Sequence, residues 1–336
     1  MGPSIDRARA TANDTRYRPG QKKGHYESFF QRANHPSRPL AFWVRYTLFS
    51  PEGRPGDAIG ELWAIYFDGE TGRHAVAKVE QPYSSCRFSR SGLDVKVGDA
   101  ALRPGEMRGE AASGEHSLAW DLSWTGKEPP LFLLPMYLYD APFPKAKALV
   151  PEPMAKWNGK LVVDGREIDI DGWVGSQNHN WGSKHTDHYA WGQVAGFDEA
   201  PESFLEVATA QIKIGPLWTP PLAPVVLRHE GAEYAMNGLL QSAWKGHFEY
   251  FTWQFSGAGP DVRLRGRIFG RRDNFVGLRY WNPPGGHKWC LNSKIAACEV
   301  TLHWKSGRSP VTLRSANRAA FEILTEDDRH GIEIRA

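Results

Sequence analysis

At 336 residues, the chain exceeds the length at which one hydrophobic core usually stops growing, so two packed units are expected. Its 41 Lys and Arg residues nearly balance its 38 Asp and Glu residues, and the resulting net charge of +3 argues against a nucleic-acid partner. No apolar run approaches the roughly 20 residues that a membrane-spanning helix needs, so no transmembrane segment is expected.

Residues 1–23 contain arginines and lysines but no apolar core segment, which argues against a secretory signal. We expect a disordered or loosely docked arm there. The three cysteines, Cys86, Cys290 and Cys298, show no zinc-type spacing, and their odd number favours free thiols in a reducing compartment. Together these features predict a cytoplasmic protein.

Large side chains alternate along many segments, which is the pattern of β-strands. Residues 40–49 (LAFWVRYTLF) place Trp43 and Arg45 on one face and Tyr46 on the other. Both faces carry bulky residues, which suits a barrel with a filled interior and a covered outside, and no long segment has a helical period. The chain is therefore predicted to be all-β. Comparable strand patterns occur at 62–72, 160–175, 204–215, 249–255, 262–270, 274–281 and 298–304.

The segment 176–194 (SQNHNWGSKHTDHYAWGQV) concentrates polar groups that cost free energy to bury unless they are paired. A metal site, a catalytic cluster and a hydrogen-bonded corner with Gly182 at a positive φ are the three interpretations. On an extended strand, Asp187 and His188 point to opposite faces, and the spacing matches no helical H-E-x-x-H motif. No metal site is therefore predicted, although four side chains have suitable chemistry: His179, His185, Asp187 and His188.

The same segment resembles the signature of the superfamily that contains tocopherol cyclase, carotenoid 1,2-hydratase (hydroxyneurosporene synthase) and AttH-like proteins. That signature reads roughly Glu-Lys-Asn-Trp-Gly, a short loop, and Trp-x-Trp-x-Gln. Asn180-Trp181-Gly182 matches its first part, and Trp191 and Gln193 match its second, with Tyr189 in place of the first Trp. The chain departs from it at Asn178-His179, where the superfamily has Glu-Lys.

The resemblance implies two tandem lipocalin-like antiparallel β-barrels, at residues 24–183 and 184–336, with the signature segment at their junction. It implies no cofactor, because the characterised relatives act on apolar isoprenoid chains without one. The implied reaction is proton-initiated hydration, cyclisation or isomerisation of an apolar, isoprenoid-like or polycyclic small molecule. The acid–base candidates are Asp187, His179 and His188; the substrate-binding candidates are Trp43, Arg45, Tyr46, Asn180, Trp181, Trp191 and Gln193.

Two other classes of function remain open from the sequence. A carrier for lipids or hydrophobic metabolites would have the same cavity without catalysis, and a carbohydrate-binding protein would need flat aromatic platforms outside the barrels. A carboxylic acid inside the cavity would favour the enzyme. Glu206, flanked by apolar residues, is either such an acid or a solvent-facing side chain. Arg45, if buried, needs a partner such as Glu61 or Glu80. The sequence does not indicate an oligomeric state.

Overall fold

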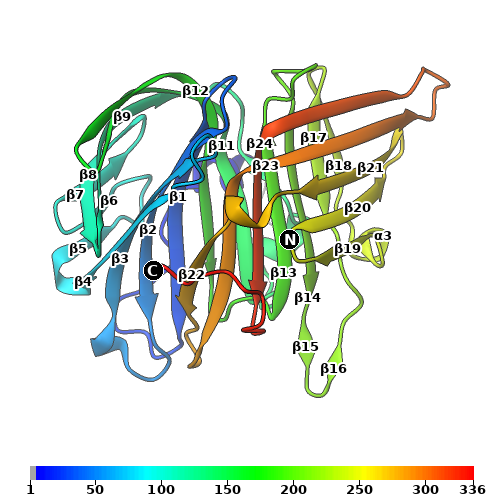
Figure 1. Ribbon diagram of the computed structural model, residues 1–336. Coiled ribbons are helices and arrows are strands. Elements are labelled where there is room, and N and C mark those ends of the chain that lie inside the picture. Colours follow the sequence, from blue (N-terminus) through cyan, green and yellow to red (C-terminus); the bar gives the residue numbers. More distant parts are fainter. Residues whose placement is uncertain (1–4) are drawn as a thin grey trace.

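The computed structural model describes residues 5–336 and consists of two curved antiparallel β-sheets that lie side by side (Figure 1). This confirms the predicted all-β, lipocalin-like fold. Within residues 5–336, no helix is long and apolar enough to cross a membrane. The helices are short: α1 (Ile5–Ala10), α2 (Tyr137–Asp140), α3 (Leu239–Ser242) and the 3-10 turns η1 (Pro55–Asp57), η2 (Tyr83–Ser85) and η3 (Arg272–Asn274).

The first sheet has twelve strands in the order β4-β3-β2-β1-β12-β11-β9-β8-β7-β6-β5, with β10 paired to β11. Contacts of β4 with β8 and β9 bring distant parts of this sheet together and nearly close it into a barrel. Its strands are β1 (His25–Asn34), β2 (Leu40–Ser50), β3 (Ile59–Asp68), β4 (Ala75–Pro82), β5 (Cys86–Phe88), β6 (Val95–Val97), β7 (Ala100–Arg103), β8 (Glu106–Ser113), β9 (His116–Thr125), β10 (Leu131–Phe132), β11 (Ala146–Val163) and β12 (Arg166–Gly182).

The second sheet has ten strands in the order β18-β17-β14-β13-β24-β23-β21-β20-β19, with β22 paired to β23, and β15 and β16 form a separate hairpin. Its strands and those of the hairpin are β13 (His188–Ala195), β14 (Phe204–Gln211), β15 (Lys213–Ile214), β16 (Leu217–Trp218), β17 (Val225–His229), β18 (Ala232–Met236), β19 (Gly246–Glu249), β20 (Thr252–Ala258), β21 (Val262–Phe269), β22 (Val276–Trp281), β23 (His287–Trp304) and β24 (Val311–Thr325).

The two faces of β2 pack against different layers, which explains why both carry bulky side chains. Phe42 and Tyr46 belong to the core inside the first sheet. Trp43 belongs to a separate cluster that includes Leu278 and Tyr280 of β22, so it packs between the two sheets. The period-2 alternation therefore assigns one face to the barrel interior and the other to the contact with the second sheet.

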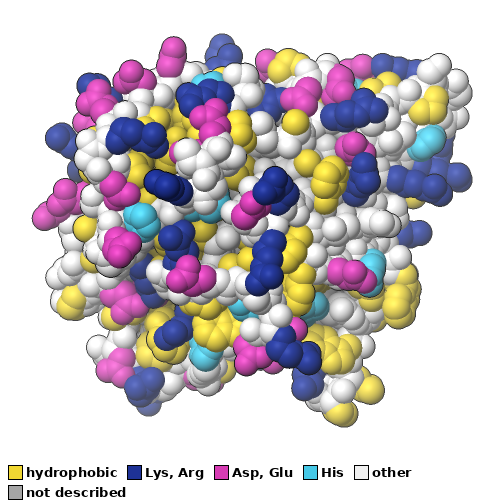
Figure 2. Space-filling view, in the orientation of Figure 1, with side chains coloured by type: hydrophobic (Ala, Val, Ile, Leu, Met, Phe, Trp, Pro, Cys, Tyr) yellow, Lys and Arg dark blue, Asp and Glu magenta, His cyan; other side chains and the backbone are white. Residues whose placement is uncertain are grey.

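The surface mixes both signs of charge. Figure 2 shows basic and acidic side chains interspersed over most of one face, in keeping with the 41 Lys and Arg and 38 Asp and Glu residues of the chain. Several charged or titratable side chains are instead buried, among them Arg45, Glu206 and Glu322.

The segment before β1 packs against the first sheet. Ala12 and Tyr17 are buried, and the backbone N–H groups of Arg16 and Tyr17 donate hydrogen bonds to the carboxylate of Glu27 on β1. Of the arm expected at residues 1–23, residues 1–4 lie outside the described part of the chain.

Gly182, at the end of β12, is required for a reason other than the expected positive φ, because it is not among the glycines with that conformation. A Cβ at this position would lie 2.5 Å from the carbonyl oxygen of Lys145 and 2.9 Å from Cε1 of Tyr26. The corner therefore depends on the close approach of neighbouring chain segments, which only a residue without a side chain permits.

We expect Gly182→Val to destabilise the protein by about 1–3 kcal/mol, the usual scale for overpacking, because the backbone oxygen cannot move aside as a flexible side chain can. Thermal unfolding followed by circular dichroism measures the effect. Gly56→Ala is the control, because a Cβ at Gly56 meets nothing within 4 Å. Equal melting temperatures for Gly182→Val and the unmodified protein would contradict this account.

Candidate active site

A cavity of about 190 Å³ lies between the two sheets. Its walls come from β1, β2, β11 and β12 on one side and from β13, β14, β22 and β24 on the other. Most of the lining is apolar, which suits a hydrophobic ligand. The lining residues with polar or titratable side chains include Tyr26, Arg45, Asn178, His179, Asn180, His185, Tyr189, Glu206, Tyr280 and Glu322.

Two lining residues are also exposed to solvent and mark an entrance. Phe143, which follows α2, is 42% exposed, and Leu239, at the start of α3, is 40% exposed. An apolar molecule can therefore reach the cavity past side chains that are themselves apolar.

Glu206 is a buried carboxyl group in the wall of this cavity. Its Oε1 accepts a hydrogen bond from Nε1 of Trp191 at 2.7 Å, and its Oε2 accepts one from Nε2 of Gln193 at 2.8 Å. Burial raises the pKa of Glu206 to about 7, because removal from water penalises the carboxylate more than these hydrogen bonds favour it. Glu206 can therefore carry a proton at neutral pH.

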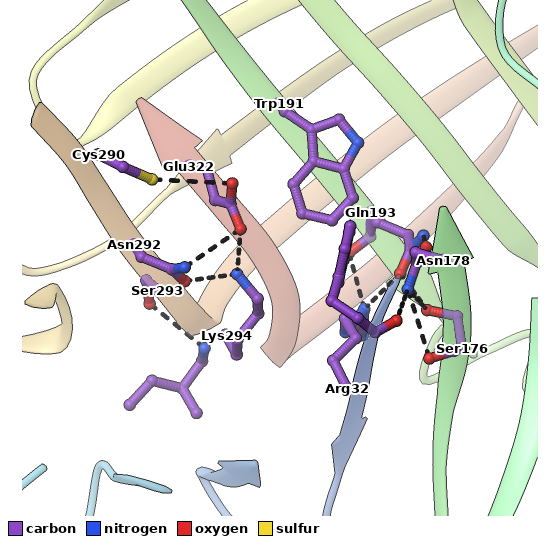
Figure 3. A network of polar contacts seen from close by, with 12 residues as sticks. Arg32, Ser176, Asn178, Trp191, Gln193, Cys290, Asn292, Ser293, Lys294 and Glu322 are labelled. Atoms are coloured by element: carbon purple, nitrogen blue, oxygen red, sulfur yellow. Dashed lines mark hydrogen bonds and ion pairs between the residues drawn. The ribbon is translucent and has the colours of Figure 1, made fainter. Parts of the chain in front are cut away.

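Gln193 fixes the position of this acid through a fully used amide group. Its Oε1 accepts hydrogen bonds from Nη1 of Arg32 at 3.1 Å and from Oγ of Ser176 at 2.6 Å. Its Nε2 donates to Oδ1 of Asn178 at 2.8 Å as well as to Glu206. Because both donors and both acceptor positions are engaged, the amide cannot turn without losing hydrogen bonds (Figure 3).

A second carboxylate, Glu322 on β24, is paired with a lysine inside the protein. Its Oε1 accepts hydrogen bonds from Nζ of Lys294 at 2.7 Å and from Nδ2 of Asn292 at 3.2 Å. Trp191 faces Glu322 across the β13–β24 register, and Nζ of Lys294 lies 5.5 Å from the Trp191 ring. Figure 3 shows Trp191 between the Glu322 group and the Gln193 group.

His179 lines the cavity but is tied to a structural ion pair. Its Nδ1 lies 2.7 Å from the carbonyl oxygen of Ala12, and its Nε2 lies 2.8 Å from Oε1 of Glu27. Burial alone would raise the pKa of Glu27, but hydrogen bonds from His179 and His25 outweigh it and lower the pKa to about 2. Glu27 is therefore ionised, and both ring nitrogens of His179 lie within hydrogen-bonding distance of an oxygen atom.

Asp187 and His188 lie outside the lining of the cavity. Asp187 accepts hydrogen bonds from Nζ of Lys184 at 2.5 Å and from the backbone N–H of Lys213 at 3.0 Å. Although partial burial opposes it, these two donors lower the pKa of Asp187, which makes it a poor proton donor near neutral pH. Nδ1 of His188 lies 3.1 Å from the carbonyl oxygen of Leu324, and its ring packs on Phe248.

The cavity thus brings together five of the ten residues that the sequence indicated: Trp43, Arg45, His179, Asn180 and Trp191. Tyr46 points into the core of the first sheet, and Gln193 lies behind the cavity wall, where it donates hydrogen bonds to Glu206 and Asn178. Trp181 instead packs against Arg16, whose guanidinium carbon lies 5.0 Å from the ring centroid. The sequence left Glu206 undecided between a buried acid and a solvent-facing side chain, favoured a plain hairpin around Tyr280 over a role at a barrel rim, and did not indicate Glu322.

In the part of the chain that the structure describes, no group of three or more His, Cys, Asp or Glu side chains is placed to hold a metal ion.

His185, one of the four side chains with metal-binding chemistry, stacks between Tyr26 and Tyr280, with ring centroids 3.9 and 5.7 Å away.

Comparisons with known proteins support the fold. No family model matches the chain. The uncharacterized protein Rv0493c of Mycobacterium tuberculosis strain H37Rv is 25% identical over 310 residues, which cover 89% of each chain. Kievitone hydratase from Nectria haematococca has a TM-score of 0.58 at 12% identity, over 92% of this chain and 90% of its own. A protein described as AttH, from Nitrosomonas europaea, has a TM-score of 0.55 at 14% identity, over 90% and 92%. At these identities the solved structures show a shared AttH-type, lipocalin-like fold.

Proposed function

We propose that the protein is a cofactor-independent enzyme that protonates an apolar small molecule in the cavity between its sheets and so initiates hydration, cyclisation or isomerisation. The observation that carries the proposal is Glu206: a buried acid, hydrogen-bonded on both oxygens and able to hold a proton at neutral pH, in the wall of an aromatic cavity. A binding protein needs no such group, because burying a carboxyl group costs free energy. The fold shared with a protein named as a hydratase supports the same class of reaction.

The proposed step moves one proton and leaves the charge balanced. The Glu206 O–H bond breaks as a carbon–hydrogen bond forms at a double bond of the substrate, which leaves a carboxylate and a carbocation. The indole faces of Trp43 and Trp191, both in the cavity wall, can stabilise that cation by about 0.5–2 kcal/mol each. Water, an internal nucleophile or loss of a neighbouring proton then quenches the cation, and the released proton returns to Glu206.

Deuterium transfer tests this proposal even while the substrate is unidentified. The purified protein is incubated in heavy water with a lipophilic cell extract, and products are analysed by mass spectrometry. Hydration, cyclisation and isomerisation by this route all place one non-exchangeable deuterium on carbon. Native mass spectrometry of the same preparation shows whether an apolar ligand is bound. A bound ligand that never acquires deuterium would identify a carrier and overturn the enzymatic proposal.

A further inference from the structure

Arg45 is a buried cation in the cavity wall without a counter-charge of its own. It lies on β2 and is 5% exposed. Among residues 5–336, its one hydrogen bond runs from Nη2 to Oγ of Ser28 at 2.7 Å, and it forms no ion pair. Its Nε is buried without a partner. Burial alone would lower the pKa of Arg45, but Tyr280, Glu322 and Glu61 together raise it, so the buried guanidinium keeps its charge while its Nε lacks an acceptor.

The two carboxylates that act electrostatically on Arg45, Glu322 and Glu61, each form an ion pair with a lysine. Glu61 pairs with Lys78 at 2.8 Å, and Glu322 pairs with Lys294 at 2.7 Å. The two partners that the sequence suggested for Arg45, Glu61 and Glu80, both pair with Lys78 instead. His185 adds no charge, because burial, together with Arg45 and Lys288, lowers its pKa to about 3. Arg45 is therefore the one of these buried cations that no carboxylate among residues 5–336 contacts directly.

Two further hydrogen-bond donors beside Arg45 also lack acceptors. Nε1 of Trp43 and Oη of Tyr280 are buried without partners, and both residues line the cavity. The guanidinium carbon of Arg45 lies 4.4 Å from the Tyr280 ring centroid and 5.9 Å from that of Trp43. Burial raises the pKa of Tyr280 well above its ordinary value, so its hydroxyl keeps its proton and can donate. One indole N–H, one guanidinium N–H and one phenol O–H, from three neighbouring residues that line the cavity, thus have no acceptor.

We propose that the substrate is an apolar acid whose carboxylate binds at Arg45, Trp43 and Tyr280, an inference that rests on the proposed function and names its substrate class. A carboxylate supplies oxygen acceptors for all three donors, and a guanidinium is the side chain best matched to it in shape and charge. Leu133, Leu149 and Leu222, which line the same cavity, provide apolar contacts for the rest of the molecule. The bound anion also offsets the positive charge that protonation by Glu206 creates.

The test compares two probes that share one apolar skeleton, 4-phenylbutyrate and 4-phenylbutan-1-ol, by isothermal titration calorimetry on the full chain at neutral pH. We expect the acid to bind more tightly than the alcohol. Arg45→Met should weaken binding of the acid about 100-fold, the scale for removing one partner of a buried charge pair, and leave the alcohol unchanged. Tyr280→Phe, which removes only the O–H, should weaken the acid about tenfold.

The controls separate a binding role from a structural one. Arg279→Met removes an exposed arginine that lies 5.6 Å from the Trp289 ring, and it should leave binding of both probes unchanged. Ligand-free Arg45→Met should melt no lower than the unmodified protein, because it replaces a buried cation that forms no ion pair with an apolar side chain of similar length. Inorganic phosphate, an anion without an apolar body, should not compete with the acid.

The inference and the proposed function can fail separately. Glu206→Gln should bind the acid at least as tightly as the unmodified protein, whatever its effect on deuterium transfer. Equal binding of acid and alcohol, or equal losses of both in Arg45→Met, would overturn the carboxylate site and leave proton transfer by Glu206 standing. Loss of acid binding in Arg45→Met, with deuterium transfer unaffected by Glu206→Gln, would overturn the enzymatic role of Glu206 and leave the carboxylate site standing.

Discussion

Glu206→Gln should fold normally and transfer deuterium to substrate about 100-fold more slowly, or slower still, which is the usual scale for a lost general acid. Glutamine has nearly the same shape and can still accept a hydrogen bond from Trp191, whose Nε1 lies 2.7 Å from Oε1 of Glu206. It cannot donate an acidic proton. The measurement is the initial rate of deuterium incorporation, with the melting temperature determined on the same preparation.

The pH profile adds a second signature to this result. A general acid works only while it holds its proton, and the pKa of Glu206 is raised to about 7. The rate in the unmodified protein should therefore be high below neutral pH and fall as the pH rises through about 7. A rate that increased through neutral pH would assign Glu206 the role of a base.

Asp187→Asn is the matched comparison, because Asp187 lies in the signature segment that first suggested catalysis. It is held by Lys184 and lies outside the cavity lining, so its substitution should leave the rate within a few-fold. If Asp187→Asn abolished transfer and Glu206→Gln preserved it, the proton donor would be Asp187 and the roles of the two acids would be reversed.

Strand alternation was enough to predict the fold class but not the location of the cavity. In residues 40–49 the pattern shows two faces with bulky side chains. In the structure, Tyr46 lies in the interior of the first sheet and Trp43 lies between the two sheets. Period-2 alternation states that two residues point in opposite directions, but not which layer each one meets. Which layer each face contacts depends on the packing of β2 against β22, which lies more than 200 residues away in the sequence. A single sequence does not indicate contacts between segments so far apart.

The buried charges show a similar limit. Glu206 and Glu322 each interrupt an apolar strand, in FLEVATAQ and AAFEILT, and this signal could have marked both as buried acids. What separates them is their partners: Glu322 meets Lys294, while Glu206 meets only neutral donors. The dense segment at 176–194 drew attention to Asp187 because it concentrates polar side chains. Many of these serve to satisfy one another, and the acid that they position, through Gln193, lies on the next strand.

Glu27→Gln should cost more stability than a typical single substitution, about 3–5 kcal/mol, or roughly 4–7 °C in melting temperature for a chain of this length. Glu27 is fully buried and accepts hydrogen bonds from His25, His179 and the backbone of Arg16 and Tyr17. A glutamine presents one acceptor oxygen where two are used, and its amide NH2 would face backbone N–H groups that now donate to the second oxygen. Glu70→Gln, at an exposed ion pair with Arg38, is the control and should cost less than about 1 kcal/mol.

The pH dependence of this loss identifies its origin. The pKa of Glu27 is lowered to about 2 from an ordinary value of 4.5, so the folded state favours the carboxylate. A depressed pKa contributes stability that is fully present above the unfolded value and disappears as the pH falls toward the folded one. The difference in stability between the unmodified protein and Glu27→Gln should therefore shrink as the pH falls from 4.5 toward 2. Chemical denaturation at a series of pH values measures it. If the difference stayed constant down to pH 2, the loss would come from packing, because the other carboxyl groups are common to both proteins and cancel in the difference.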